Sequence, residues 1–350
     1  MQAILEQYGI PYTETDIQKF GTGLINHTWV VNRGTEKYIL QRINEQVFKE
    51  PMAIVHNIDL LAEYLAHHYP EYLFVAPLKT KNGSSVVKDA AGGYFRLVPF
   101  VKGSCSVDVV TTPEQAYAAA AQFGKFTRLL NGFDASKLNI TIPDFHNLSL
   151  RYAQFLRALK NGDAQRIAAA SSLIEYLQSQ SGIVETYEQI LQDDNFPVRV
   201  MHHDTKISNV LFDAQEHGLC VIDLDTVMPG YFISDLGDMM RTYLSPVSEE
   251  ESDFDKIEVR KDFYEAIVNG YYNEMKAVMT DAEPRYFFYA GTFMIYMQAL
   301  RFLTDHLLGD PYYGAKYPGH NLVRSGNQAV LLQKLQTKKS LLEGRGMRNS

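Results

Sequence analysis

The stretch VRVMHHDTKISNVLFDAQEHGLCVIDLDT, residues 198–226, alternates short apolar runs with polar clusters. The apolar runs are residues 198–201, 210–212 and 219–222. We predict a strand over each, because each run is short and bounded by turn-forming residues. Polar residues follow the first run at 202–209 and the last at 223–225. Strands of this kind can hold carboxylates in fixed positions.

The spacing of His202, Asp204 and Asn209 has the form H-x-D-x-x-x-x-N, which is typical of the catalytic loop in phosphoryl-transfer enzymes. Such enzymes need a carboxylate to orient the attacking hydroxyl and oxygen ligands to hold Mg²⁺. We predict Asp204 as the catalytic residue, and Asn209 and Asp223 as the metal ligands. Lys206 would neutralise charge on the transferring group.

Asp and Asn residues in loops are usually turn or capping residues, and this is the simpler interpretation of any one of them. Here the motif follows one predicted strand, and the sequence VIDLD follows another. This combination favours a chemical role.

The composition indicates an ordinary globular protein of 350 residues, with 46% hydrophobic and 21% charged residues. The formal net charge of −8 and the lack of a basic run argue against nucleic acid or an anionic membrane as the partner. The two cysteines, Cys105 and Cys220, indicate neither a disulfide framework nor a zinc site. With no signal-peptide pattern at the N-terminus, we expect a cytoplasmic location.

Residues 1–100 are predicted to form an N-terminal domain, an antiparallel sheet with one inserted helix. A Gly-rich turn contains Gly21, Gly23 and Asn26 and begins a hairpin, and small residues there let backbone N–H groups approach phosphates. A plain hairpin turn is the alternative. The expected strands are 28–31, 37–43, 73–78, 85–88 and 94–100, and the expected helices are 2–9 and 52–68.

Residues 101–350 are predicted to form a mainly helical C-terminal domain. The expected helices are 113–131, 144–160, 163–194, one capped by Ser234 or Asp235, and 249–345 with breaks at 281–284 and 309–319. Residues 286–303 approach the length of a membrane span, but Gln298 and Arg301 favour a buried helix. The fold class is thus α+β with two lobes.

These residues resemble the aminoglycoside phosphotransferase superfamily, the small-molecule kinases with a protein-kinase-like fold. Within it, the chain is most similar to the N-acetylhexosamine 1-kinases. The resemblance runs from residue 21 to 313, through GLINHTWVV, YILQRIN, FRLVPFVKG, MHHDTKISNVLFD, VIDLDTVMPG, DLGDMMR and RFLTDHLLGDPYY. It implies an ATP- and Mg²⁺-dependent kinase with a nucleotide-binding N-lobe.

The resemblance also implies roles for individual residues. The nucleotide would contact Gly21, Gly23, Asn26, Thr28, Pro99, Val101 and Lys206, with a hinge at 98–101. Asp235 would support the catalytic loop without taking part in the chemistry.

The predicted third strand lacks the lysine that the family places on the phosphates. Either Gln41 or Arg42 takes its place, because side chains alternate along a strand and only one can face the nucleotide. We favour Arg42 for its charge. Asp59 or Glu63 would be its partner on the following helix, and a surface salt bridge is the alternative for all of them.

On the acceptor side, the resemblance places Arg301 and Tyr312 against the sugar. Asp225 and His27 are further candidates to contact it. Arg301 and Asp305 are four residues apart, so a simple pair on one helix is the alternative.

We therefore expect a kinase that phosphorylates the anomeric hydroxyl of N-acetylglucosamine or N-acetylgalactosamine, as a monomer or homodimer. A second hypothesis keeps the chemistry with another acceptor, such as homoserine, choline or an aminoglycoside. A third is a nucleotide-binding protein without transfer activity.

Overall fold

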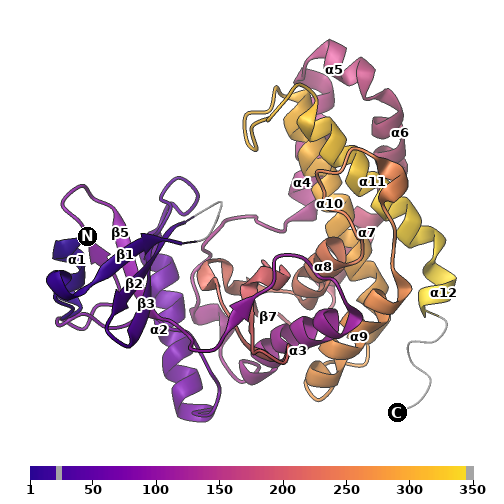
Figure 1. The fold of residues 1–350 in the computed structure, drawn as a ribbon. Helices are drawn as coiled ribbons and strands as arrows, with labels where there is room; N and C mark the ends of the chain where they lie inside the picture. The colour runs from indigo at the N-terminus through magenta and orange to yellow at the C-terminus, as the bar shows by residue number, and fades with distance from the viewer. Residues whose placement is uncertain (21–25, 344–350) are drawn as a thin grey trace.

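The computed structural model describes residues 1–20 and 26–343, which form a sheet-based N-lobe (α1 to β5) and a helical C-lobe (β6 to α12) (Figure 1). This confirms the predicted two-lobed α+β fold. The N-lobe elements are α1 (Gln2–Gln7), a 3-10 turn (Tyr12–Glu14), β1 (Asp16–Lys19), β2 (His27–Arg33), β3 (Glu36–Arg42), α2 (Pro51–His68), β4 (Val87–Lys88) and β5 (Tyr94–Pro99).

The C-lobe begins with one short strand and is otherwise built mainly of helices. Its elements are β6 (Cys105–Ser106), α3 (Pro113–Leu129), α4 (Leu148–Asn161), α5 (Ala164–Ala169), α6 (Ser171–Ser179), α7 (Gly182–Gln192), β7 (Arg199–Met201), β8 (Val210–Phe212), β9 (Gly218–Val221), β10 (Met228–Gly230), α8 (Phe232–Tyr243), α9 (Lys261–Met275), α10 (Phe287–Leu307), α11 (His320–Thr337) and α12 (Lys339–Glu343).

The N-lobe sheet has the strand order β1-β2-β3-β5-β4, with every neighbouring pair antiparallel. Side chains alternate between its two faces. On the outer face, Val31, Leu40 and Leu97 pack with Ile4 and Leu5 of α1 in one buried cluster. The inner face is therefore left to meet the C-lobe.

Helix α2 shares its buried side with the C-lobe. The predicted apolar positions Ile54, Ile58, Leu61 and Leu65 are all buried and belong to the main core, together with C-lobe helices. The buried Asn57 side chain also donates to the backbone carbonyls of residues 139 and 227, at 2.9 and 3.0 Å. Because α2 is shared in this way, the division into domains at residue 100 stays a prediction.

The chain leaves the N-lobe sheet after β5 and immediately pairs with the centre of the C-lobe. Cys105 and Ser106 of β6 lie opposite Phe212 and Leu211 of β8, the strand that follows the catalytic motif. Strand β9 completes this sheet, in the order β6-β8-β9. The segment between the lobes is thereby tied to the site itself.

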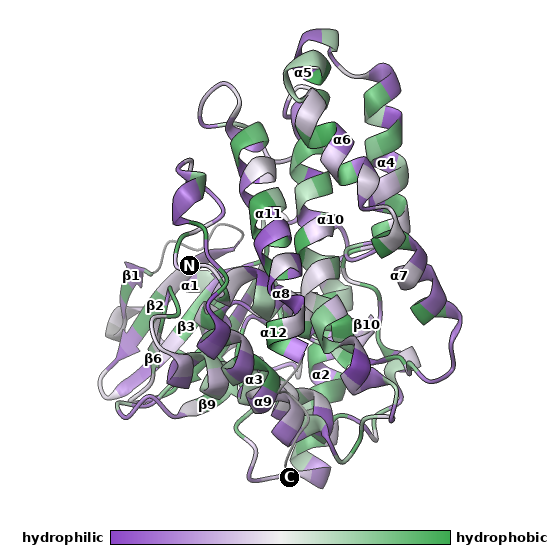
Figure 2. Cartoon of the chain, turned by 90° about the vertical axis from the view of Figure 1, so that its right-hand side faces the viewer, coloured by the Kyte–Doolittle hydropathy of each residue, from purple (hydrophilic) through white to green (hydrophobic). Residues whose placement is uncertain are grey.

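Helix α10 lies at the centre of the C-lobe, where Phe293, Tyr296 and Phe302 are fully buried. It packs against α4, α8 and α11. In Figure 2 the C-lobe helices stand side by side and show both hydrophobic and hydrophilic positions, as helices sharing one core should. Residues 286–303 thus form a core helix as expected, and no helix in the described part of the chain is long and apolar enough to cross a membrane.

Some element boundaries differ from the sequence-based expectations. Residues 73–78 form no strand, although the Leu78 N–H donates to the Leu97 carbonyl at 2.7 Å. Strand β7 pairs with β10, which the sequence did not predict. Helix α8 is preceded by Tyr231 as its N-cap residue, so Asp235 lies inside its first turn and is free to face the catalytic loop. Residues 249–260 form only a short 3-10 turn before α9.

Gly270 marks the closest approach of α9 to α3, because a Cβ there would overlap the Tyr117 carbonyl oxygen. We expect Gly270→Ala to push the two helices apart and to lower the free energy of unfolding by about 1–3 kcal/mol. Thermal unfolding checks this against Gly182→Ala in α7, where a Cβ meets nothing within 4 Å. Equal midpoints for both variants would contradict this packing.

Candidate active site

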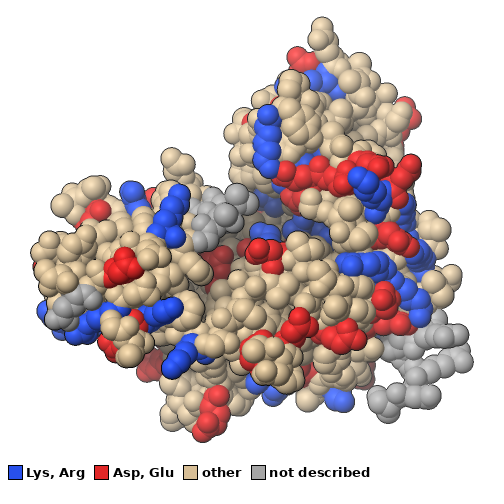
Figure 3. Space-filling view, in the orientation of Figure 1, with Lys and Arg blue, Asp and Glu red and all other residues tan. Residues whose placement is uncertain are grey.

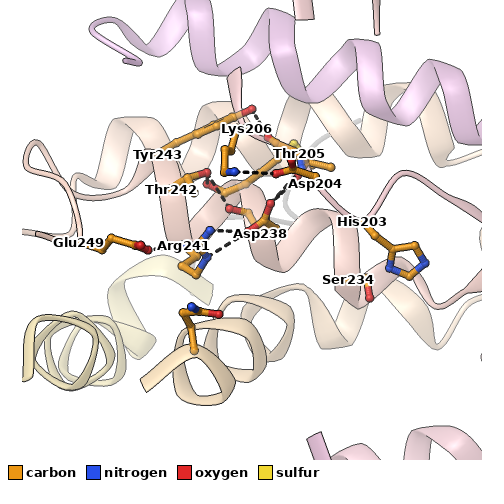
Figure 4. A network of polar contacts seen from close by, with 12 residues as sticks. His203, Asp204, Thr205, Lys206, Ser234, Asp238, Arg241, Thr242, Tyr243 and Glu249 are labelled. Atoms are coloured by element: carbon orange, nitrogen blue, oxygen red, sulfur yellow. Dashed lines mark hydrogen bonds and ion pairs between the residues drawn. The ribbon is translucent and has the colours of Figure 1, made fainter. Parts of the chain in front are cut away.

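The catalytic motif lies on the loop between β7 and β8, and two aspartates of α8 hold the backbone of this loop. The N–H groups of His202 and His203 donate to the two oxygens of Asp235 at 2.9 and 2.7 Å. The Thr205 N–H donates to Asp238 at 2.9 Å (Figure 4). The residue between these anchors, the predicted catalytic base, is therefore fixed on both sides.

Two non-glycine residues near the site adopt left-handed backbone conformations. His203 has φ of +65° and Asp223 has φ of +59°, and each such residue costs on the order of 1–3 kcal/mol. Burial lowers the pKa of His202, so its neutral ring donates to the Ile222 carbonyl at 2.9 Å. The Ile222 N–H in turn donates to the Asn209 carbonyl at 2.8 Å. These bonds hold the two strained turns against each other.

The carboxylate of Asp204 is partly exposed and lies 3.2 Å from the Lys206 ammonium. The negative charge of Asp204 raises the pKa of Lys206, so the lysine stays protonated beside it. Behind them, the Arg241 guanidinium bonds Asp238 at 3.0 Å and Glu249 at 2.6 Å (Figure 4). Charges of alternating sign thus extend from the catalytic loop into the C-lobe.

The residues predicted to bind a metal suit a divalent cation. The Asn209 amide nitrogen donates to the Asp204 carbonyl at 2.9 Å, which leaves its oxygen as the donor for a cation. The side chain of Asp223 is open to solvent, yet desolvation by the protein around it raises its pKa to about 7, and repulsion from Asp225 and Asp204 adds to this. A cation would relieve that repulsion. The described residues contain no group of three His, Cys, Asp or Glu side chains able to hold a metal.

The register of the N-lobe sheet decides which side chain of β3 faces the site. Gln41 lies opposite Thr28 and Arg96, and the Arg96 Nε donates to Gln41 at 2.9 Å. Arg42 is exposed on the other face, where its guanidinium lies 5.9 Å from the Phe95 ring. The structure therefore brings Thr28 and Gln41 to the inner face and does not bring Arg42 there.

His27 is also turned away from the catalytic loop. It lies opposite Arg42 in the sheet, and its ring is 6.2 Å from that of Trp29, another outer-face residue. Alternation along β2 gives the reason, since its neighbour Thr28 takes the inner position. The structure therefore does not bring His27 to the inner face of the sheet, and its contact with the sugar stays a prediction.

Asp225 is engaged inside the protein, although we expected it to accept sugar hydroxyls. One oxygen accepts from the Asn26 amide at 2.8 Å and the other pairs with Arg96. Only 2% of the Asp225 side chain is exposed. A sugar could reach it only by breaking these contacts. Gly21 and Gly23 lie outside the described residues.

The proposed adenine hinge is a short turn directly after β5. The Val101 carbonyl accepts the Ser104 N–H at 3.3 Å and the Ser104 hydroxyl at 2.7 Å. Pro99 is exposed in the last position of β5, opposite Tyr38. The turn is therefore closed by its own bonds, at the junction between the two lobes.

Arg301 and Tyr312, the residues predicted to contact the acceptor, lie together in the C-lobe, with a guanidinium nitrogen 3.5 Å from the phenol oxygen. Arg301 does not pair with Asp305, whose oxygens accept the N–H groups of Tyr312 and Tyr313 at 2.8 and 2.9 Å. Arg301 and Tyr312 line a cavity of about 500 Å³. Its walls are Arg151, Gln154, Arg157, Ala158, Asn161, Arg301, Thr304, Asp305, Leu308, Pro311, Tyr312 and Tyr313.

This geometry is matched by known proteins. The phosphotransferase enzyme family matches residues 16–277, which is more than half of the chain. The chain belongs to the phosphotransferase enzyme family. Its enzymatic class is therefore the transfer of a phosphoryl group to a hydroxyl group of a small molecule.

Solved structures similar to this phosphotransferase cover almost its whole length. An aminoglycoside phosphotransferase from Alicyclobacillus acidocaldarius matches with a TM-score of 0.64 and 14% identity, over 100% of this chain and 97% of that one. A microcompartment-associated aminopropanol kinase matches with a TM-score of 0.57 and 16% identity, over 99% of this chain and 98% of that one. A spectinomycin phosphotransferase bound to ADP and spectinomycin matches with a TM-score of 0.57 and 14% identity, over 94% of this chain and 95% of that one. At these identities the likeness concerns the fold alone.

Three residues that shape the site of this phosphotransferase were not predicted from its sequence. Arg96 gave no motif, and Asp238 lies one helical turn after the predicted supporting acid. Glu249 belongs to the acidic segment 248–255, which resembles a solvated loop. In the structure it pairs with Arg241 and Arg324. Only the i, i+3 spacing of Asp235 and Asp238 on one helix was a usable signal.

The raised pKa of Asp235 predicts how the free energy of unfolding changes with pH. Burial raises that pKa to about 7, against the opposing effect of its two N–H donors. Folded protein therefore keeps a proton that the unfolded chain releases near pH 4, so this stability is complete below about pH 4 and is lost as pH rises through about 7. We expect Asp235→Asn to flatten the fall in melting temperature over that range. Asp134→Asn, on an exposed turn, should keep the wild-type slope, and an unchanged slope in Asp235→Asn would contradict the assignment.

Proposed function

We propose that this phosphotransferase is an ATP- and Mg²⁺-dependent kinase that phosphorylates the anomeric hydroxyl of an N-acetylhexosamine, N-acetylglucosamine or N-acetylgalactosamine. The observation that carries the chemistry is the partly exposed Asp204, fixed between the anchors from α8 and placed on one loop with Asn209. The surface is hollowed between the two lobes (Figure 3), which gives nucleotide and acceptor a common meeting place.

In the proposed reaction, the Asp204 carboxylate accepts a hydrogen bond from the acceptor hydroxyl and takes its proton as the new oxygen–phosphorus bond forms. The bond between the γ-phosphorus and the oxygen bridging to ADP breaks, and ADP leaves. Lys206, 3.2 Å away, orients the Asp204 carboxylate. Asn209 and Asp223 would hold Mg²⁺, which neutralises phosphate charge when bound.

The acceptor pocket supports a sugar over a cationic acceptor. Arg151, Arg157 and Arg301 line it, and its one carboxylate, Asp305, is occupied by backbone N–H groups. Burial lowers the pKa of Arg151, and the positive charge of Arg301 lowers it further. Like charges without a paired carboxylate repel amines, whereas guanidinium groups donate readily to sugar hydroxyl and acetamide oxygens. Choline, aminopropanol and aminoglycosides are therefore disfavoured.

The acceptor class is tested by following ADP release with Mg-ATP across N-acetylglucosamine, N-acetylgalactosamine, glucose, galactose, choline, homoserine and kanamycin. We expect turnover with the N-acetylhexosamines and an anomeric phosphate by ³¹P NMR. Asp204→Asn should bind ADP like the wild type but lose at least about 100-fold in kcat, because general-base catalysis supplies that much. Asp213→Asn, on the partly exposed turn between β8 and β9, should keep full turnover. Turnover near the wild-type rate in Asp204→Asn would refute the assignment of the base.

Arg301 provides a second test of the acceptor site. We expect Arg301→Gln to raise KM for the sugar about 10- to 100-fold with little change in kcat, because bonds from a charged donor contribute roughly 1.5–3 kcal/mol. KM for ATP should not change. The matched control is Arg128→Gln, which breaks a half-exposed pair with Glu274 outside the pocket. A gain of activity with amine acceptors alone would favour the second hypothesis and exclude the sugar.

A further inference from the structure

The inner face of the N-lobe sheet carries a buried cation, and this cation is not on β3. Kinases of this fold place a lysine on the third strand, paired with a glutamate on the following helix and aimed at the nucleotide phosphates. Here the corresponding inner position is Gln41, which is neutral. Its direct neighbour across the β3–β5 ladder is Arg96.

The usual acidic partner on the helix is also engaged elsewhere. Asp59 of α2 pairs with Lys79 at 2.8 Å and accepts the Ser85 hydroxyl at 2.5 Å. No ion pair between β3 and α2 is found in the described part of the chain. The charge arrangement that normally serves the phosphates is therefore rebuilt from other residues.

Arg96 lies on the inner face of the sheet, directly beside Gln41. Its Nε donates to Gln41, and its Nη1 pairs with Asp225, two residues after the proposed metal ligand Asp223. The exposed fractions of the Arg96 and Asp225 side chains are only 4% and 2%. A guanidinium has five N–H donors in a rigid fork, so it can bind a carboxylate and a phosphate together. Asn26, next to the phosphate loop, bonds the same Asp225.

We propose that Arg96 of β5 replaces the missing β3 lysine as the residue that binds the nucleotide phosphates, and that Asp225 positions it. This rests on the proposed function, because it requires that the cleft binds a nucleotide. Its consequence is that the cation on the phosphates is joined directly to the metal-binding turn. In the usual arrangement, the same cation is joined to a helix of the N-lobe.

The test compares the affinity for ADP with that for adenosine, which lacks phosphates, using equilibrium dissociation constants without any acceptor. The test variant is Arg96→Gln/Asp225→Asn, because Arg96→Gln alone would leave a buried, unpaired carboxylate and destabilise the fold. We expect it to lose about 10- to 100-fold in ADP affinity, with adenosine affinity unchanged, since a charge-assisted bond to phosphate is lost. Arg42→Gln, on the outer face of the same sheet, should leave both affinities unchanged.

Two further variants separate phosphate binding from a purely structural role. Adding Gln41→Lys to the double variant should restore most of the ADP affinity, because the lysine then occupies the usual β3 position. Asp225→Asn alone should lower ADP affinity less than the double variant does, since the guanidinium remains but loses the carboxylate that positions it. An unchanged ratio of ADP to adenosine affinity in the double variant, or no gain from Gln41→Lys, would overturn the proposal. If the wild type itself binds ADP no better than adenosine, the proposed function fails instead.

Discussion

The site depends on one buried carboxylate, that of Asp235. It lies in the first turn of α8 and accepts the N–H groups of His202 and His203 at the end of β7. An acid at this end of a helix is favoured by the helix dipole, which offsets part of the cost of burying its charge. Through these two bonds, His203 can keep its left-handed conformation, and the chain turns sharply enough to present Asp204 to the cleft.

A second constraint joins the lobes, and it passes through Asp225. The Asn26 amide from the N-lobe, the Arg96 guanidinium from β5 and the turn that carries Asp223 all meet at this carboxylate. Pairing of β6 with β8 ties the hinge to the same region from the other side. The inner face of the N-lobe sheet and the turn that carries Asp223 are therefore held by the same contacts, so a change in either is felt by the other.

The sequence predicts most of the catalytic half of the site, because that half is local. Asp204 and Asn209 lie five residues apart on one loop, and the strands that carry the loop are short apolar runs. Contacts between distant segments could not be predicted. The Arg96–Asp225 pair joins residues 129 apart, and Asn26 lies 199 residues from Asp225. No spacing rule connects such positions until the sheet register and the packing of the lobes are known.

The choice between Gln41 and Arg42 shows the same limit on a smaller scale. Alternation along β3 requires that one of them faces inward, but it does not say which. The register with β5 decides, because it places Gln41 beside Arg96 and Arg42 beside Phe95. Charge alone favoured Arg42, but the charged residue at this point of the inner face is Arg96, on the neighbouring strand β5. A charge that one strand lacks can thus be carried by the next strand, at the same point of the inner face.

The cavity lined by Arg301 and Tyr312 is not built from one local motif as the catalytic loop is, because its charged side chains come from separate helices. Arg301 and Arg151 line this pocket, and its one acid, Asp305, is used to hold the backbone of residues 312–313. Ordering Tyr312 beside Arg301 through Asp305 leaves this pocket with donors and without a free carboxylate. Under the proposed function, these donors would face a neutral, oxygen-rich acceptor.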